Sequence, residues 1–329
     1  MKMRRAKTEK RGFVVVVVLC MVIMLGVLLL GFNHESRANL RSVNDFKKSK
    51  QALNCARAGL NIAIAAIKGT IDIHTNSTLL NLLSGERTFD VGDGKCSITV
   101  VDENSKLNVN LLKNKTGRLN RTRIDQLLRL IDLLNQKHAD HSHIGYGMVP
   151  SIIDWTDNDD EVTCLPFIKR ENLGAESSYY DRLNPPYKCK NRAFDTVEEL
   201  MLLKGVTPQV FDRIRDYITV KGDGKININS ASKRVLESLS EKMDAVLAQR
   251  IIDRRKFKPF ASITELRDVP GMTDSVYYAI KKTATIMPTA RYYNVTSRGD
   301  VDNLSCTIAA ILRRNTKTKN VEVILYEEL

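Results

Sequence analysis

The pattern of hydrophobic and polar positions begins with one uncharged stretch close to the N-terminus. Residues 13–32 read FVVVVVLCMVIMLGVLLLGF and contain no charged side chain. As a helix this stretch would be about 30 Å long, which is enough to cross the hydrocarbon core of a bilayer. From Glu35 to about Gly69, apolar residues recur at three- and four-residue steps, as on one face of a helix. We therefore predict one long helix over 13–68 that is apolar in its first half, half-buried in its second half, and ends at Gly69.

Runs typical of β-strands stand on both sides of a long central region. Residues 88–101 predict one or two strands around a turn at 92–94. Three further strands are predicted near the C-terminus, at 292–297, 305–313 and 320–326, joined by turns at 299–300 and 315–319. These runs indicate one antiparallel sheet that is interrupted by a large, mainly helical insertion. The expected fold class is α+β: a long N-terminal helix, an antiparallel sheet and an inserted helical domain.

The insertion contains an internal near-repeat. Lys106–Asn110 (KLNVN) is echoed by Lys225–Asn229 (KININ), and each copy precedes a predicted helix. The apolar/Asn alternation predicts a short strand whose Asn side chains bond backbone groups where strand gives way to helix. Two other stretches, 199–218 and 265–282, each combine a short amphipathic helix, a Gly turn and a Thr-capped second helix. This order is typical of helix-hairpin-helix units.

Helix-hairpin-helix units suggest an alternative function, because many bind DNA phosphates through backbone N–H groups in a Gly-x-Gly turn. In this chain Thr207 and Thr273 stand where the second glycine of that turn would be. A side chain at that position raises the steric cost of close approach by a phosphate. We therefore expect a helical packing module and no nucleic acid partner. A membrane-anchored helix-hairpin-helix DNA-binding protein of competence or pilus type is the alternative.

The charge distribution predicts how the chain is oriented in a membrane. The formal net charge is +13, and six basic residues and one acidic residue precede Phe13. The positive-inside rule then keeps this leader in the cytoplasm and exports the rest of the chain. The positive excess of the exported part is compatible with nucleic acid or anionic surfaces and is diagnostic of neither.

The cysteines carry a weaker signal. Five of the six lie beyond the apolar stretch, and in an exported domain some of them should pair, although five is an odd number. Cys164–Cys189 and Cys96–Cys306 are two conceivable pairs, between which the sequence does not decide. No CxxC spacing is present, which argues against a zinc ribbon or a thioredoxin-like site.

Motifs of catalysis are missing from the sequence. It contains no nucleophile elbow, P-loop or HExxH motif, so we expect no catalytic residues and no enzyme activity. His138, His141 and His143 share one short segment and could form a transition-metal site. We interpret them as a solvated surface group.

One acidic segment suggests a metal site. Asp154–Glu161 contains five acidic residues and no basic residue, and their repulsion is costly unless solvent or a cation screens it. The alternation of Asp157, Asp159 and Glu161 can aim three carboxylates the same way in an extended loop. A solvated acidic loop is the alternative. Hard oxygen ligands without a nearby thiol or His favour calcium over zinc.

Two further features indicate a family. Lys10-Arg11-Gly12-Phe13, followed by the apolar stretch, resembles the type IV prepilin family. The resemblance implies that a prepilin peptidase cuts after Gly12 and methylates Phe13, and that the helix lies first in the membrane and later in a filament core. Most members have Glu at the fifth mature position, where this chain has Val17. That omission resembles the large minor pseudopilin K family of type II secretion systems.

The acidic segment adds to the second resemblance. Together with GAExxYY at 174–180 and NPPY at 184–187, it is similar to segments of the pseudopilin K family, in which calcium is bound in this region. The resemblance implies a calcium site and a set of carboxylate ligands, with Asp154 orienting Trp155 or capping a turn. The implied ligands are Asp157, Asp159, Glu161, Glu176 and Asp181.

The resemblance extends over nearly the whole chain and implies its organisation. The implied parts are a leader (1–12), a transmembrane helix (13–33), a spine helix with the first strands (34–101), an inserted helical domain (102–289) and C-terminal strands (290–329). It implies a single-pass inner-membrane protein with a periplasmic C-terminal domain. Its implied role is at the tip of the type II secretion pseudopilus. There it would initiate assembly with minor pseudopilins of the I and J types, for export of folded proteins across the outer membrane.

Overall fold

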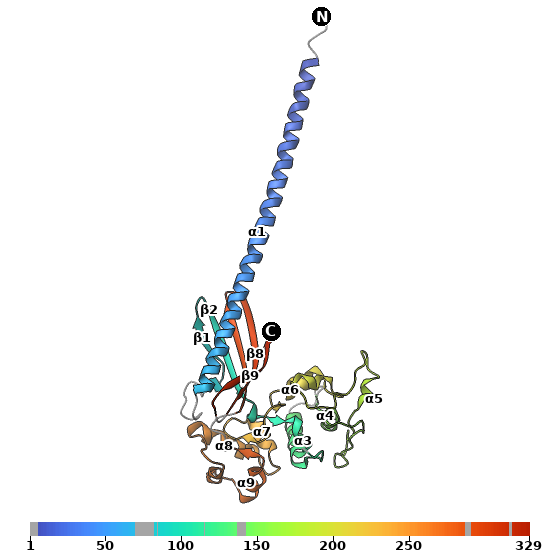
Figure 1. The fold of residues 1–329 in the computed structure, drawn as a ribbon, viewed down its shortest axis with the longest axis vertical. Coiled ribbons are helices and arrows are strands. Elements are labelled where there is room, and N and C mark those ends of the chain that lie inside the picture. The colour runs from blue at the N-terminus through green and yellow to red at the C-terminus, as the bar shows by residue number, and fades with distance from the viewer. Residues whose placement is uncertain are drawn as a thin grey trace.

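The structure is a computed structural model of the chain, and it describes residues 6–69, 82–83, 85–114, 116–136, 143–286, 291–315 and 318–329. Figure 1 shows a long helix, a sheet packed beside the end of that helix, and a group of short helices beyond the sheet. The predicted α+β arrangement is confirmed.

Helix α1 (Ala6–Gly69) is continuous, as the hydrophobic pattern predicted. Its apolar stretch is exposed along its whole length, and in the described part of the chain α1 is the one helix long and apolar enough to cross a membrane. Its second half buries one face, which includes Ala52, Ala56, Leu60 and Ile67. The helix therefore has one part suited to lipid and one part that belongs to a folded domain.

The sheet is five-stranded, antiparallel between all neighbours, and ordered β1-β2-β7-β8-β9. Its strands are β1 (Arg87–Val91), β2 (Gly94–Asp102), β7 (Tyr292–Val301), β8 (Leu304–Arg314) and β9 (Val321–Glu328). The pairing of β2 with β7 joins two segments that are far apart in sequence, from Lys95↔Asp300 to Asp102↔Tyr293. The sheet is thus interrupted by one long insertion, as predicted.

One predicted turn was wrong. Gly299 and Asp300 lie inside β7, and the chain reverses instead at 302–303, where Asp302 adopts a φ of 52°. The reason is the approach of α1, since a Cβ atom on Gly299 would lie 2.0 Å from the carbonyl oxygen of Ala52 and 2.5 Å from the backbone nitrogen of Ala56. Gly299 therefore serves close helix–sheet packing.

The insertion between β2 and β7 forms its own hydrophobic core, separate from the core between α1 and the sheet. Its α-helices are α3 (Arg121–Asn135), α4 (Met148–Thr156), α5 (Ser177–Tyr180), α6 (Pro208–Ile214), α7 (Lys233–Ser238), α8 (Ala245–Phe257) and α9 (Asp274–Lys281). Its 3₁₀ helices are η1 (Glu103–Ser105), η2 (Val109–Leu111), η3 (Glu198–Leu202) and η4 (Ile263–Asp268). Its short strands are β3 (Leu107–Asn108), β4 (Ile218–Thr219), β5 (Ile226–Asn227) and β6 (Ala284–Thr285).

The near-repeat corresponds to two similar halves of the insertion. β3 pairs in parallel with β4, and β5 pairs in parallel with β6. The side chain of Asn110 donates to the carbonyl of Phe194 and accepts from its N–H, and Asn229 does the same with Phe260. The predicted role of these Asn residues in satisfying backbone groups is confirmed.

The two helix–turn–helix stretches are also present, although the leading element of each is a 3₁₀ helix, η3 or η4. Gly205 and Gly271 form the turns, with φ of 81° and 90°. The hydroxyls of Thr207 and Thr273 accept from backbone N–H groups of α6 and α9. These threonines therefore cap their own helices.

Neither conceivable disulfide is formed, because the described cysteines are all free. Cys96 on β2 and Cys306 on β8 both lie opposite Gly299 on β7, so a whole strand separates them. Two strand spacings amount to about 9.6 Å, beyond the roughly 7 Å that a disulfide can span between Cα atoms. Cys164 is exposed, whereas Cys189 is buried and donates to the carbonyl of Asp154.

The close contact at Gly299 generates a prediction about stability. Gly299→Ala should lower the free energy of unfolding by about 1–3 kcal/mol, because the added methyl group overpacks the interface between α1 and β7. Gly69→Ala is the matched control, since no atom lies within 4 Å of its added Cβ. Urea denaturation of the full chain in detergent measures both. Equal stability of the two variants would contradict this account of Gly299.

Candidate metal-binding site

The acidic segment begins on a buried helix. Almost every residue of α4 is buried, including Ile152, Ile153 and Trp155, so the helix carries Asp154 into the core of the insertion. Asp157 is the C-cap of α4: its N–H donates to the carbonyl of Ile153, and its backbone is extended. The chain therefore leaves the helix with its acidic side chains beside the core.

Three carboxylates converge at this helix end. Ligand oxygens of Asp157, Asp159 and Glu176 lie within 4.8 Å of one another. Glu176 comes from the GAE segment, at the N-cap of α5, and is 1% exposed, while Asp157 is 9% exposed. Asp159 is exposed. The site is thus a half-open group with two buried carboxylates and one that faces solvent.

Several buried oxygens at this site have no hydrogen-bond partner. They are Oδ1 of Asp157, Oδ2 of Asp154 and both carboxylate oxygens of Glu176. Lys113 forms an ion pair with the other oxygen of Asp157, and the thiol of Cys189, a weak donor, lies beside Glu176. Burying charged oxygens without partners is costly, and a hard divalent cation is the group that would satisfy them. The donor set therefore fits calcium.

The electrostatics of the site follow from burial and repulsion. Burial, followed by the charges of Asp154 and Asp157, raises the pKa of Glu176 to about 8. Burial also raises the pKa of Asp157, against the opposing effect of Lys113. The pKa of Asp154 is raised by burial as well, partly offset by its bonds with Thr163. All three groups thus resist ionisation when no cation is bound.

The structure brings together three of the five residues expected as ligands. Glu161 and Asp181 are exposed and lie outside the group formed by Asp157, Asp159 and Glu176. Asp154 caps a turn, as expected, because its Oδ1 accepts from the N–H of Thr163 at 2.9 Å. Its unpartnered Oδ2 was not anticipated. Asp157 lies just past the end of α4 in extended backbone, so helical spacing in the sequence does not indicate it.

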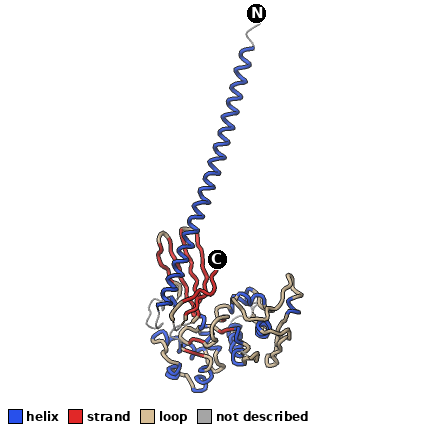
Figure 2. The backbone as a smooth tube through the Cα atoms, viewed as in Figure 1, coloured by secondary structure: helices blue, strands red, loops and turns tan. Residues whose placement is uncertain are grey.

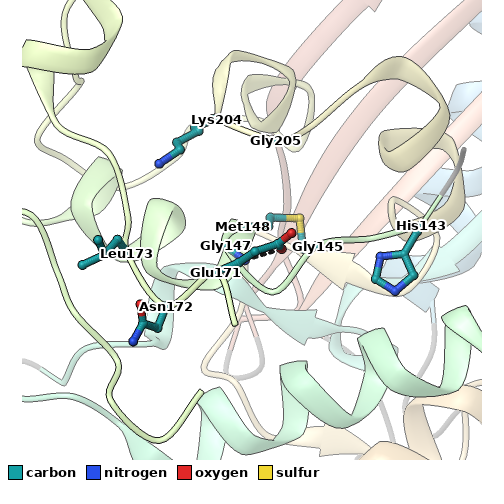
Figure 3. Close-up of a pocket in the computed structure, with 9 residues that line it drawn as sticks. All are labelled: His143, Gly145, Gly147, Met148, Glu171, Asn172, Leu173, Lys204 and Gly205. Carbon is teal, nitrogen blue, oxygen red and sulfur yellow. Dashed lines mark hydrogen bonds between the residues drawn. The ribbon is translucent and has the colours of Figure 1, made fainter. Parts of the chain in front are cut away.

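A pocket of about 580 Å³ opens at the other end of α4 (Figure 3). It lies between the segments 143–148, 171–173 and 204–205. Oε2 of Glu171 accepts from the N–H of Gly147 at 3.4 Å, so a carboxylate of the chain already occupies this helix N-terminus. His143 lines the pocket, whereas His138 and His141 lie outside the described residues. We assign this pocket no ligand.

Comparison with known proteins gives a consistent family. Two family models, both described as "Type II secretion system (T2SS), protein K", match residues 105–223 and 226–286. Together they span more than half of the chain, and they coincide with the two halves of the insertion. Type II secretion system protein K of Pseudomonas aeruginosa is 25% identical over 96% of this chain and 92% of its own length. The proteins of the same name from Aeromonas hydrophila and Klebsiella pneumoniae are each 22% identical, over 66% and 67% of this chain and 66% of their own lengths.

A solved structure shares the fold. A chain of the crystal structure of the GspK-GspI-GspJ complex from the enterotoxigenic Escherichia coli type 2 secretion system superposes with a TM-score of 0.66 at 18% identity. The match covers 88% of this chain and 99% of that chain.

The raised pKa of Glu176 generates a prediction about pH. The ordinary value is 4.5 and the folded value is about 8, so between these values the unfolded chain releases a proton that the folded chain retains. Stability contributed by this group is therefore lost as pH rises through this range. With chelator present, the melting temperature of the full chain should fall as the pH rises from 4.5 to about 8. The fall should be less steep in Glu176→Gln than in the wild type. Glu198→Gln, at an exposed position, is the control; equal slopes in all three proteins would show that Glu176 is not protonated.

Proposed function

The chain belongs to the type II secretion system protein K family, and on this premise we propose that it is the minor pseudopilin at the tip of the pseudopilus. There it initiates assembly with minor pseudopilins of the I and J types, so that folded proteins are exported across the outer membrane. The observation that carries the proposal is the position of the insertion. It lies beyond the sheet, at the end of the molecule opposite the apolar part of α1 (Figure 2).

We infer a membrane anchor from the difference between the two halves of α1. The apolar half is exposed and long enough to span a bilayer, which supports a single-pass anchor in the inner membrane. The basic leader then stays in the cytoplasm and the sheet and insertion lie in the periplasm. Prepilin peptidase cuts after Gly12, leaving Phe13 as the methylated N-terminus. The mature helix can then move from the membrane into the filament.

Two features support the tip position. The insertion lies beyond the sheet, on the side away from the apolar part of α1 (Figure 2), and there it would block a subunit stacked farther from the membrane. In addition, Val17 supplies no carboxylate to pair with the N-terminal amine of a neighbouring subunit, so this subunit cannot use that contact to join beneath another. Both features allow subunits to be added only on the membrane side. The mechanism is assembly by packing, without a catalytic step.

Labelling of assembled pseudopili tests the position. In cells that overproduce the pseudopilus, gold-labelled antibody against the insertion should mark one end of each filament. Mass spectrometry of the same purified filaments should identify N-methyl-Phe13 as the first residue. Antibody spread along the filament length would contradict the tip position. An intact leader, or a cut near Ala38, would contradict the processing.

We propose further that Asp157, Asp159 and Glu176 hold a calcium ion. The support is the set of buried oxygens without partners and the excess of acidic over basic groups around them. A bound cation would fix the chain at the end of α4. There Trp155 packs edge-on to Tyr180 at 5.3 Å and is stacked with Phe194 at 6.4 Å between ring centroids. The ion therefore would stabilise the first half of the insertion from its centre.

A thermal-shift experiment on the full chain tests the calcium site. Calcium at about one hundred times its Kd should stabilise the chain by about 2.7 kcal/mol over the same protein in chelator. Asp157→Asn and Glu176→Gln should remove this stabilisation. Asp216→Asn, at an exposed position remote in sequence from the site, should retain it. An unchanged melting temperature of the wild type on adding calcium would rule the site out.

A further inference from the structure

The end of α8 exposes an aromatic ring that the fold does not use. Phe257, the last residue of the helix, is 93% exposed, more than any large apolar residue in the apolar stretch of α1. Phe260, three residues later, is fully buried in the core of the insertion. Single exposed apolar side chains are common on protein surfaces. The surroundings of Phe257 therefore decide whether its exposure has a function.

The backbone holds this ring outward. Lys258 precedes Pro259 and is extended, with φ of −145° and ψ of 110°, as a residue before proline favours. The helix therefore ends at Phe257. On the same turn, the guanidinium of Arg255 donates to the carbonyl of Ile228 and ties the helix end to the segment that follows β5. The position of the ring is thus fixed by the fold of the second half of the insertion.

Basic side chains gather at the same helix end. Residues 250–258 contain five basic residues and one acidic residue. The guanidinium groups of Arg250, Arg254 and Arg255 donate to backbone carbonyls within the chain. Positive charge near a helix C-terminus is favourable in addition. The three arginines are therefore explained by the fold.

The two lysines beside the ring are not explained in this way. Lys256 and Lys258 are both exposed, and in the described part of the chain no acidic side chain pairs with either. We call Lys256, Phe257 and Lys258 the KFK segment. It joins an apolar ring to two ammonium groups on long, flexible stems. Aromatic and basic side chains combine in this way where proteins lie on anionic lipid surfaces.

The composition of the KFK segment favours a fluid lipid surface over a folded partner. The planar fork of arginine suits a fixed carboxylate or phosphate, whereas lysine acts as a hydrated point charge. The unpaired charges here are both lysines. Val246, the other large apolar residue of α8 that is exposed, lies eleven residues from Phe257, or about 16 Å along the helix. The ring is therefore isolated, whereas a stable protein interface needs a broad buried core.

The place of α8 in the molecule indicates which lipid surface the segment can meet. α8 lies beyond the sheet, at the end of the molecule away from the apolar part of α1 (Figure 1). A chain anchored through α1 therefore points this end away from its own membrane. Across the periplasm, the lipid surface that faces this end is the outer membrane.

We propose that the KFK segment binds anionic phospholipid on the periplasmic face of the outer membrane. Phe257 enters the boundary between headgroups and acyl chains, and Lys256 and Lys258 contact the lipid phosphates. This inference goes beyond the proposed function and rests on it only for the direction in which α8 points.

Co-sedimentation with vesicles tests the inference. The full chain is inserted through α1 into phosphatidylcholine nanodiscs, which leave the insertion in solution. The wild type should pellet with vesicles of phosphatidylglycerol and phosphatidylethanolamine, and not with vesicles of phosphatidylcholine. Lys256→Gln and Lys258→Gln should each weaken binding about fivefold, which corresponds to about 1 kcal/mol per basic residue at an anionic surface. Phe257→Ser should weaken it about tenfold, because the apolar ring is lost.

Matched controls separate the KFK segment from overall charge and apolarity. Val246→Ser changes an exposed apolar residue at the other end of α8, and Lys169→Gln with Arg170→Gln removes two exposed charges from the first half of the insertion. Each should change binding by less than about twofold at physiological salt, because distant charges are screened. Melting temperatures check that every variant is folded.

The other outcomes overturn the inference. They are wild type that stays in solution with the anionic vesicles, control variants that weaken binding as much as the KFK variants, and tighter binding of single-stranded DNA than of vesicles. If filament ends are still labelled by antibody in these cases, the proposed function stands. Vesicle binding by a chain whose label is spread along the filament would instead contradict the tip position and leave the lipid contact in place.

Discussion

The contact between α1 and the sheet is the constraint on which the rest of the structure depends. It is made by small residues: Ala52 and Ala56 on the helix lie against Gly299, and Gly59 lies against Ser297. The hydroxyl of Ser297 donates to the carbonyl of Ala56 at 2.8 Å, a buried bond to the helix backbone. With no large side chain between them, the helix and β7 have one close-packed arrangement. The apolar half of α1 is thereby held at a fixed orientation to the folded domain.

A buried carboxylate, that of Asp102, fixes the insertion relative to the sheet. Asp102, the last residue of β2, accepts hydrogen bonds from the side chains of Asn227 and Ser230, at 2.8 and 2.6 Å, and from the N–H of Asn104. Burial raises the pKa of Asp102, and these bonds oppose the rise. Asn227 belongs to the second half of the insertion, whereas Asn104 opens the first. A single side chain therefore joins the sheet to both halves.

Hydrophobic periodicity was sufficient to predict α1, the interrupted sheet and the paired Asn segments, since each depends on local alternation of apolar and polar residues. It failed at Gly299, because a glycine required by close helix packing has the same sequence signal as a glycine in a turn. The hypothesis of a Cys96–Cys306 disulfide failed for a related reason, since strand order decides which of these cysteines are neighbours. Both errors concern contacts between elements that are distant in sequence.

The candidate metal site shows the same limit at shorter range. The prediction that Asp157, Asp159 and Glu161 point the same way assumed an extended loop. In the structure, Oδ1 of Asp159 accepts a hydrogen bond from the N–H of Glu161 and turns the chain. Glu176, from a different segment, joins the group instead. Its inclusion was expected from the family resemblance, and nothing in the local spacing of the acidic segment indicates it.

The rigid contact beneath α1 has a consequence for assembly. The exposed surface that α1 and the sheet share is held in one arrangement by Gly299, Ser297 and the Arg57–Glu328 pair. Little conformational entropy is then lost at this surface on binding, which favours association. The same rigidity fixes the insertion at the end of the helix, through Asp102. One packing contact between small residues thus determines where the sheet and the insertion stand relative to the apolar half of α1.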